Sequence, residues 1–313
     1  MRSVTVVGCG IVGLTTALAL QEKGWKVTLV AKEKFYKTLS HKVGAIWFPF
    51  EVHPFKDATK WGSRAYKRYQ EELFPGNGVS FIPFTVVYDE SSNTSWVNKI
   101  PDGAVRKAVD HELPANSKSA YIAMVPLAEP PLYLPSLFQR FLEAGGTFKR
   151  EEISSLEQLA GLDFKVINCT GLGAKTLCKD DQLTAMRGQI LRVDTLNVAS
   201  CVNSTKPGSL SYVIKRSTDC ILGGTDYTDD WNLNIDPNDT DLILKRYREM
   251  GISNDEPIIL EQLVGLRPKR PKVRFEYDES FANVFHNYGH GGAGFTVAWG
   301  CALELAERLE LSP

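Results

Sequence analysis

No apolar run in the sequence reaches the roughly 20 residues that a transmembrane helix needs. A surplus of basic side chains is also missing, because 36 Lys and Arg face 37 Asp and Glu, for a formal net charge of −1. Nucleic-acid-binding surfaces require such a surplus. Ile11–Leu20 is the best apolar candidate near the start, but it lacks the basic leader of a signal peptide. We therefore expect a cytoplasmic protein with no membrane span and no nucleic-acid partner.

Closely spaced cysteines are absent as well. The six cysteines form neither a CxxC pair nor a spacing that suits a metal ion; they are Cys9, Cys169, Cys178, Cys201, Cys220 and Cys301. This pattern predicts reduced, mostly buried thiols in an intracellular protein, and no metal centre. The sequence alone does not decide whether any two of them form a disulfide.

The composition is that of a globular protein. Hydrophobic residues make up 43% of the 313 residues and charged residues 23%, which argues against disorder. The length fits either one large α/β unit or two interlocked domains.

The start of the chain predicts a βαβ unit. Ser3–Val7 is a short β-branched run, Ile11–Glu22 carries apolar residues at helical spacing, and Lys26–Ala31 is a second β run. This order implies a parallel sheet. Further on, short strand candidates predict a more antiparallel region; they are Ile190–Val193, Ser211–Ile214 and Cys220–Leu222.

Similar pieces recur in the middle and at the end of the chain. Phe164–Cys169 has the pattern of a buried strand, and Val284–His286 that of a short strand before a glycine loop and a helix at Phe295–Leu309. We therefore expect an α/β fold in which a Rossmann-like domain is interleaved with a smaller, mixed-sheet domain. The first comprises residues 1–50, 145–185 and 260–313, and the second residues 51–144 and 186–259.

A GxGxxG motif, Gly8-Cys9-Gly10-Ile11-Val12-Gly13, lies between the first strand and the first helix. The first glycine permits the tight turn, the second lets a pyrophosphate approach the backbone, and the third lets helix and strand pack closely. The helix N-terminus favours the phosphate charge. In this context the motif predicts a dinucleotide site.

The residues after the second strand bear on which dinucleotide binds. Glu33 is the candidate that would hold the ribose hydroxyls. Lys32 leaves open a pocket for a 2′-phosphate, and with it an NADP-dependent reductase.

A second glycine-rich run extends from His286 to Thr296. Four glycines in six positions exclude a helix interior, because each costs about 1 kcal/mol there relative to alanine. They suit a loop pressed against a flat ligand, followed by a helix whose N-terminus favours the anionic pyrimidine edge of a reduced flavin. The four are Gly289, Gly291, Gly292 and Gly294.

Arg267 lies between glycine and proline breakers, in the segment Val264–Pro271. A guanidinium can grip a carboxylate with two parallel hydrogen bonds, which fix its plane as well as its position. Arg267 is therefore our candidate for binding a carboxylate, with a surface charge as the alternative, and we expect Lys269 and Arg270 to be surface charges.

These motifs occur in the order seen in D-amino-acid oxidases and D-aspartate oxidases, which the chain resembles over about residues 3 to 310. The resemblance rests on the GxGxxG motif, Gly44–Pro49, Asn168–Gly171, Arg187–Gln189, Gly223–Thr225, Gly265–Pro268 and His286–Gly292. It implies an FAD-dependent enzyme whose first domain binds FAD.

The resemblance also implies roles for individual residues. Arg267 and Tyr212 would hold the substrate carboxylate, and the Gly292 carbonyl would accept the substrate amine. Phe48 and Arg216 are further candidates for substrate contact. The implied FAD contacts are Gly8, Gly10, Ile11, Val12, Gly13, Lys32, Glu33, Ser40, His41, Gly44, Ala45, Ile46, Ile153, Thr170, Gly171, Gly291, Gly292, Gly294, Phe295 and Thr296.

The chain departs from the family pattern in two places. Gly208 stands where the mammalian enzymes carry a second active-site tyrosine, and the segment between Asp194 and Tyr212 is too short for a long lid. The sequence ends Leu311-Ser312-Pro313, without the SKL-like peroxisomal tripeptide.

The chemistry expected from the resemblance is oxidative deamination by hydride transfer to flavin N5. None of the matched substrate positions supplies a general base, so the protein would orient the substrate while the cofactor carries the reaction. The products would be a 2-oxo acid, ammonia and hydrogen peroxide, with oxygen as the second substrate. The assignment to the D enantiomer rests on the resemblance.

The choice of substrate depends on few residues. Phe48 and Phe50 suggest apolar walls and favour neutral D-amino acids such as D-alanine. A second carboxylate needs another cation, and Arg216 lies on the Tyr212 side of its strand, so D-aspartate is the alternative. A glycine oxidase-like enzyme and an inert binding protein are further alternatives. The sequence leaves open whether the chain forms a homodimer.

Overall fold

The computed structural model describes residues 2–49, 52–163, 165–203, 205 and 210–311. Phe50 and Gly208, which the sequence analysis discusses, lie outside the described residues. The chain forms two compact units. Unit 1 comprises residues 1–79, 128–185 and 267–313, and unit 2 comprises residues 80–127 and 186–266.

Unit 1 is built on a parallel sheet, as the βαβ pattern predicts. Its strand order is β14-β7-β1-β2-β6, and the C-terminal half of β13 is added antiparallel to β14. The strands of this unit are β1 (Ser3–Val7), β2 (Lys26–Ala31), β6 (Thr147–Arg150), β7 (Val166–Asn168) and β14 (Val284–His290), with β13 (Ile259–Tyr277) shared with unit 2.

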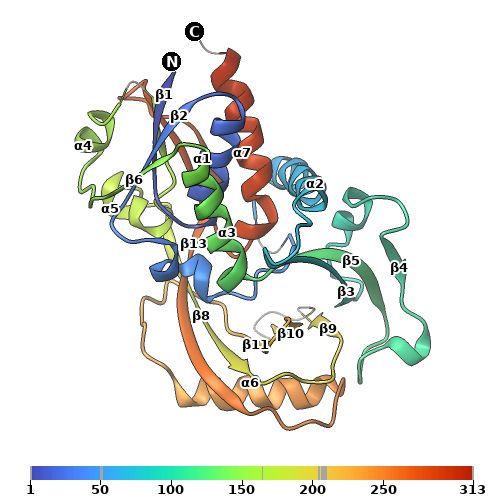
Figure 1. Cartoon of the computed structure of the whole chain (residues 1–313). Coiled ribbons are helices and arrows are strands. Elements are labelled where there is room, and N and C mark those ends of the chain that lie inside the picture. Colours follow the sequence, from blue (N-terminus) through green and yellow to red (C-terminus); the bar gives the residue numbers. More distant parts are fainter. Residues whose placement is uncertain (1, 50–51, 164, 204, 206–209, 312–313) are drawn as a thin grey trace. The chain divides into compact units, whose positions relative to one another are not determined.

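Four helices of unit 1 pack side by side, in the order α3, α1, α7, α2 (Figure 1). The helices of this unit are α1 (Ile11–Glu22), α2 (Phe55–Glu71), α3 (Pro130–Glu143), α4 (Leu156–Ala160), α5 (Ala174–Leu177) and α7 (Gly294–Leu311). Residues 51–79 and 128–144 therefore belong to unit 1 and not, as expected from the sequence, to the second domain. The reason is that α2 packs on α7, and α3 packs on α1.

Unit 2 contains a mostly antiparallel sheet in the order β4-β5-β3-β9-β10-β11-β8, with β12 paired to β8. The strand pairs β9–β10, β10–β11 and β11–β8 are antiparallel, as predicted, whereas β3 and β9 are parallel. Its elements are β3 (Val79–Val87), β4 (Val105–Lys107), β5 (Ala120–Ala128), β8 (Thr184–Val193), β9 (Ser200–Asn203), β10 (Ser211–Lys215), β11 (Cys220–Gly223), β12 (Tyr227–Thr228) and α6 (Pro237–Met250).

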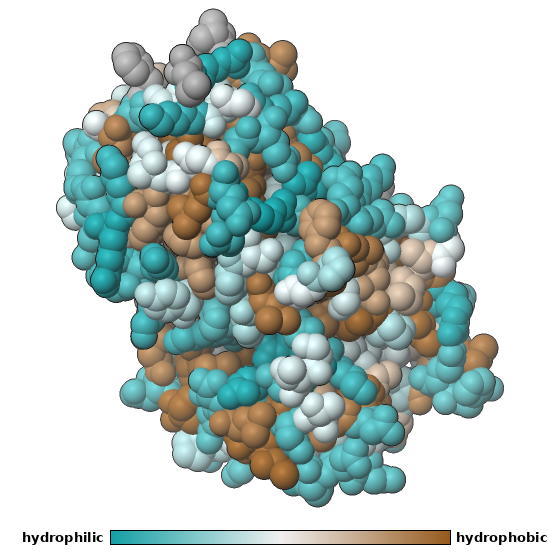
Figure 2. Space-filling view, viewed as in Figure 1, coloured by the Kyte–Doolittle hydropathy of each residue, from teal (hydrophilic) through white to brown (hydrophobic). Residues whose placement is uncertain are grey.

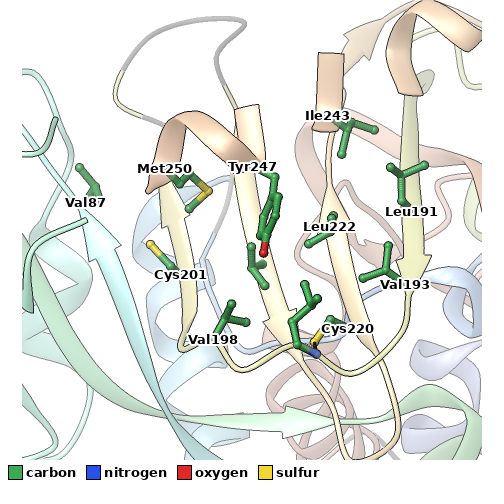
Figure 3. Packing of buried hydrophobic residues seen from close by; sticks show 12 residues of the cluster. Val87, Leu191, Val193, Val198, Cys201, Cys220, Leu222, Ile243, Tyr247 and Met250 are labelled. Carbon is green, nitrogen blue, oxygen red and sulfur yellow. Dashed lines mark hydrogen bonds between the residues drawn. The ribbon is translucent and has the colours of Figure 1, made fainter. Parts of the chain in front are cut away.

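The core of unit 2 lies between α6 and one face of this sheet. Ile243, Tyr247 and Met250 of α6 point toward the strands, where they meet residues such as Leu191 and Leu222 (Figure 3). The caps of α6 explain its bounds, because the Asp236 side chain accepts a hydrogen bond from the Asn238 N–H and Gly251 ends the helix in the left-handed conformation.

One expectation about the strands near the second glycine-rich run needs correction. We expected a loop after His286, but β14 continues to His290 because it pairs with β13. The breakers around Arg267 lie within β13, whose register against β14 shifts between Lys269 and Arg274, the segment that contains Pro271. The expected α/β fold, with a Rossmann-like unit and a mixed-sheet unit, is confirmed.

The described residues bear on the expectations about membrane helices and cysteines. No described helix is long and apolar enough to cross a membrane. The six cysteines are all free, and five are buried. Hydrophilic residues cover much of the face shown in Figure 2, interrupted by separate groups of hydrophobic residues. Among the described exposed hydrophobic residues of unit 2 are Trp231, Leu233 and Ile235.

Helices α2 and α7 pack with their backbones in close approach at Gly300. A Cβ at this position would lie 2.0 Å from the carbonyl oxygen of Trp61. We expect Gly300→Ala to lower the free energy of unfolding by about 3 kcal/mol, because the methyl group forces the two helices apart. Urea unfolding would measure this change.

Gly161→Ala is the matched control, because a Cβ there would be in ordinary contact, 3.5 Å from the nearest atom. We expect the control to change the free energy of unfolding by no more than about 0.5 kcal/mol. Equal effects of the two substitutions would contradict this account of helix packing.

Candidate active site

The three glycines of the GxGxxG motif differ in what surrounds them. A Cβ at Gly8 would lie 2.3 Å from the Cys169 carbonyl oxygen, and one at Gly13 would lie 1.8 Å from the Gly8 carbonyl oxygen. Packing alone therefore requires these two glycines. A Cβ at Gly10 would meet only the Ser40 side chain among the described residues, 3.0 Å from its Oγ. The open side of the turn is thus at Gly10, where the sequence analysis expects the pyrophosphate.

The N-termini of α1 and α7 lie next to each other in unit 1. The two helices pack together, and a Cβ at Gly294 would lie 3.6 Å from Cγ2 of Ile11. Each helix start presents N–H groups that have no partner within the helix, and a partial positive charge. The Ser40 hydroxyl accepts a hydrogen bond from one of them, the Ile11 N–H, at 3.0 Å. His41 follows Ser40 in the same 3-10 turn, Leu39–Lys42.

The segment from Gly44 to Phe48 is fixed against the start of α7. The Thr296 hydroxyl accepts a hydrogen bond from the Phe48 N–H at 3.1 Å and donates one to the Phe48 carbonyl at 2.8 Å. Ala45 has a φ of +56°, and its carbonyl accepts from the Ala128 N–H at 3.1 Å. The structure thus gives the Thr296 hydroxyl two partners within the chain, so Thr296 positions the segment that contains Ile46.

The charged candidates after β2 form ion pairs with residues at the end of β6. Lys32 Nζ lies 2.7 Å from Glu152 Oε1, and Glu33 Oε1 accepts a hydrogen bond from Arg150 at 2.8 Å. Ile153 packs at the edge of the hydrophobic cluster that contains Val30. All three candidates therefore lie at the carboxyl edge of the parallel sheet, which is where open α/β sheets bind ligands.

The Thr170–Gly171 turn follows β7 and lies beside the Gly8 turn. A Cβ at Gly8 would lie 3.3 Å from the Thr170 backbone nitrogen. The side-chain Oδ1 of Asn168 accepts hydrogen bonds from the Thr170 N–H at 3.2 Å and from the Thr170 hydroxyl at 2.8 Å. Asn168 is fully buried. Sequence reasoning included Asn168 only as part of a motif and missed this role.

Arg267 lies next to the second glycine-rich run. The Gly291 N–H donates a hydrogen bond to the carbonyl of Pro268 at 2.8 Å, and Lys269 pairs with His290 in the β13–β14 ladder. The structure therefore brings Arg267 and the Gly291–Gly292 segment together. Arg270, expected to be a surface charge, is instead largely buried and paired with Asp180 at 3.0 Å.

Tyr212 lies on β10 in unit 2, and its ring covers Gly223 of the adjacent strand. A Cβ at Gly223 would lie 2.1 Å from Cζ of Tyr212. A glycine is therefore needed opposite Tyr212, which explains physically why Gly223 accompanies the tyrosine. Sequence reasoning noted both residues but not their contact.

Arg216, four residues further along, is held by an acidic side chain. Its guanidinium donates two hydrogen bonds to the Asp219 carboxylate, at 2.5 and 2.7 Å, and both residues are buried. Asp219 also lies 3.5 Å from Arg192. The charge of Arg216 is thus neutralised within unit 2. Arg187, the arginine of the Arg187–Gln189 motif, is also buried and pairs with Asp239 of α6 at 2.6 Å, so it holds the helix to β8.

These features fit an anionic dinucleotide in unit 1. Two helix N-termini supply positive potential at one place, and the turn that precedes α1 is open at Gly10. Among the described residues there is no group of three or more His, Cys, Asp or Glu side chains that could hold a metal ion.

The chain has clear relatives among known proteins. The family described as FAD dependent oxidoreductase matches residues 3–308. D-amino-acid oxidase from Rubrobacter xylanophilus is 37% identical over 306 residues, which is 96% of this chain and 94% of that protein. D-aspartate oxidase from Homo sapiens is 30% identical over 321 residues, which is 97% of this chain and 93% of that protein. The crystal structure of glycine oxidase from Geobacillus kaustophilus has the same fold, with a TM-score of 0.80, 13% identity, and coverage of 100% and 96%.

The fold and the site therefore define an FAD-dependent oxidoreductase. The chain belongs to the FAD dependent oxidoreductase family that includes the D-amino-acid oxidases, as the resemblance of its motifs implied. FAD is its cofactor, and the protein is an enzyme.

His290, at the end of β14, gives the fold a dependence on pH. Burial lowers the pKa of His290 to about 4, and its Nε2 lies 3.8 Å from Sγ of Cys301. In the unfolded chain the pKa returns to about 6.5, so the unfolded state binds a proton that the folded state excludes. We expect this residue to cost about 3 kcal/mol of stability as pH falls from about 6.5 to about 4, and nothing above that range.

The measurement is the unfolding free energy between pH 4 and pH 7 for the wild type and His290→Gln. The variant should lose less stability over this range, because it has no imidazole to protonate. Parallel pH profiles for the two proteins would contradict the assignment.

Proposed function

We propose that the enzyme oxidises D-amino acids, with a preference for neutral ones such as D-alanine, to 2-oxo acids, ammonia and hydrogen peroxide. The observation that carries this proposal is the position of Arg267 beside the glycine-rich segment that begins α7, where the Gly291 N–H binds the Pro268 carbonyl. It is supported by the similarity to D-amino-acid oxidase from Rubrobacter xylanophilus over nearly the whole chain.

In this proposal unit 1 binds FAD and the residues of the chain orient the substrate. The Arg267 guanidinium holds the substrate carboxylate with two parallel hydrogen bonds, and the Gly292 carbonyl accepts a hydrogen bond from the amine. The resemblance to D-amino-acid oxidases assigns the Tyr212 hydroxyl to the same carboxylate. When bound, FAD would supply the hydride acceptor and would pass the electrons to oxygen, and water would hydrolyse the resulting imino acid to the 2-oxo acid and ammonia.

The protein needs no general base for this chemistry. With the carboxylate and the amine both fixed, only one enantiomer points its α-hydrogen in the reactive direction. Such alignment is worth several kcal/mol, roughly 7–11 in model reactions. The residues of the chain therefore contribute orientation and enantiomer choice.

The ion pair of Arg216 with Asp219 favours neutral substrates over acidic ones. A second carboxylate needs a cation without another strong partner, whereas Arg216 donates two hydrogen bonds to Asp219. Separating this buried pair would leave Asp219 without the stronger of its two cations. The 30% identity with human D-aspartate oxidase is the observation that keeps acidic D-amino acids as the second candidate.

A hydrogen peroxide assay of the purified enzyme tests the proposal. The panel is glycine and both enantiomers of alanine, methionine, proline and aspartate. We expect peroxide from the D enantiomers alone, with a kcat/KM for D-alanine at least about tenfold above that for D-aspartate, which corresponds to 1.4 kcal/mol of discrimination. Turnover of L-alanine or glycine alone would contradict the proposal, and a preference for D-aspartate would establish the second candidate.

Arg267→Leu tests the carboxylate site in the same assay. The substitution removes the cation while FAD stays bound, so we expect a yellow protein whose kcat/KM for D-alanine falls at least about a thousandfold, or about 4 kcal/mol. Arg267→Lys is the matched variant, because it keeps the charge but loses the planar pair of donors and should be intermediate. A fully active leucine variant would exclude Arg267 from the substrate site.

A further inference from the structure

A series of buried hydrogen bonds connects Asp278, the residue after β13, to the Thr170–Gly171 turn of unit 1. Asp278 Oδ2 lies 2.9 Å from His286 Nε2, and His286 Nδ1 lies 3.1 Å from Asn168 Nδ2. Oδ1 of the same Asn168 amide accepts hydrogen bonds from the N–H and from the hydroxyl of Thr170. His286 and Asn168 are fully buried.

Backbone N–H groups at the two ends of this series of hydrogen bonds determine which atom donates and which accepts in each of them. The Thr170 N–H can only donate, so the atom of Asn168 that faces it must be Oδ1, and Nδ2 must donate to His286. His286 Nδ1 is then an acceptor, which places the proton on Nε2, where it donates to Asp278. Burial lowers the pKa of His286, in keeping with this neutral form.

Backbone N–H groups also fix the orientation of the Asp278 carboxylate. Asp278 Oδ1 accepts hydrogen bonds from the backbone N–H groups of Ser280 at 2.9 Å and Phe281 at 3.0 Å. These two donors leave Oδ2 as the atom that faces His286.

We propose that Asp278 and His286 are positioning residues for FAD, which act through Asn168 to hold the Thr170–Gly171 turn in its binding conformation. The inference rests on the proposed contact of this turn with FAD. Neither Asp278 nor His286 needs to touch the cofactor, because the tautomer of His286 decides which end of the Asn168 amide faces Thr170.

Asp278→Asn should reverse the donor and acceptor roles in this series of hydrogen bonds. The Ser280 and Phe281 N–H groups require an oxygen, so the new amide must turn its NH₂ group toward His286. His286 Nε2 then has to accept, its proton moves to Nδ1, and Asn168 must turn its oxygen toward that proton. An NH₂ group now faces the Thr170 N–H, so this hydrogen bond is lost, whereas the Thr170 hydroxyl can turn and accept from the NH₂ group.

Asn168→Asp should restore the hydrogen bonds to Thr170 in the Asp278→Asn background, because both oxygens of a carboxylate accept hydrogen bonds. In the double variant Asp278→Asn/Asn168→Asp, one oxygen of Asp at position 168 accepts from His286 Nδ1 and the other from Thr170. Asn168→Asp alone should also keep the Thr170 bonds, with His286 donating from both nitrogens. A role of Asp278 in stability alone predicts no such rescue.

The test is the dissociation constant of FAD, measured by flavin fluorescence as FAD is added to each apoprotein, with the apoprotein melting temperature as the control for folding. We expect Asp278→Asn to weaken FAD binding about tenfold, because the Thr170 N–H is left without its acceptor. The double variant and Asn168→Asp should bind within about threefold of the wild type. A double variant as weak as Asp278→Asn, or an Asp278→Asn variant that binds like the wild type, would overturn the proposal.

A second pair of variants keeps the test decisive if Asp278→Asn does not fold. Asn168→Leu removes the acceptor of Thr170, whereas Asn168→Asp preserves it, so only the leucine variant should lose FAD affinity. Equal affinities would overturn the proposal. Because FAD binding is read without turnover, a failure of the proposed D-amino-acid oxidation would leave this result unchanged.

Discussion

The close approach of the N-termini of α1 and α7 is the constraint on which the rest of unit 1 depends. Two helix starts in one place concentrate positive potential, which is costly to assemble unless an anion is to be bound there. Glycines make the approach possible, since Gly8 and Gly13 have no room for a Cβ and Gly294 lies against Ile11. Ser40 binds one N–H of α1, and Thr296 ties the Gly44–Phe48 segment to α7. The family assignment to FAD dependent oxidoreductases agrees with this arrangement.

Around this centre the chain uses buried polar side chains to fix backbone segments rather than to carry out chemistry. Asn168 holds the Thr170 turn, Thr296 holds Phe48, and Arg187 holds α6 in unit 2. Each of these side chains is buried, so an unsatisfied group would be costly and the observed geometry is strongly favoured over alternatives. Motif residues of this kind act by positioning their neighbours, which fits an enzyme whose cofactor supplies the reactive atoms.

Local patterns in the sequence were sufficient to predict much of the fold. Ser3–Val7, Ile11–Glu22 and Lys26–Ala31 form the predicted strand, helix and strand with the predicted bounds, because periodicity and glycine turns act locally. The extension of β14 to His290 could not be predicted in this way, since it depends on pairing with β13. The ion pair of Arg216 with Asp219 and the hydrogen-bonded chain from Asp278 to Thr170 likewise depend on which side chains the fold brings together. Strand alternation gave the face on which Arg216 lies but not its partner.

The most direct test of this account is the affinity of Gly10→Ala for FAD. Gly10 has a φ of −80° and a ψ of −175°, which any residue adopts, and a Cβ there would meet only the Ser40 side chain among the described residues. Alanine should therefore displace only the Ser40 side chain, by a few tenths of an ångström, and change the melting temperature of the apoprotein little, while its methyl group covers the open side of the turn. We predict an FAD dissociation constant at least about tenfold higher than that of the wild type. An alanine variant that binds FAD as tightly as the wild type would contradict the claim that the paired helix starts form the cofactor site.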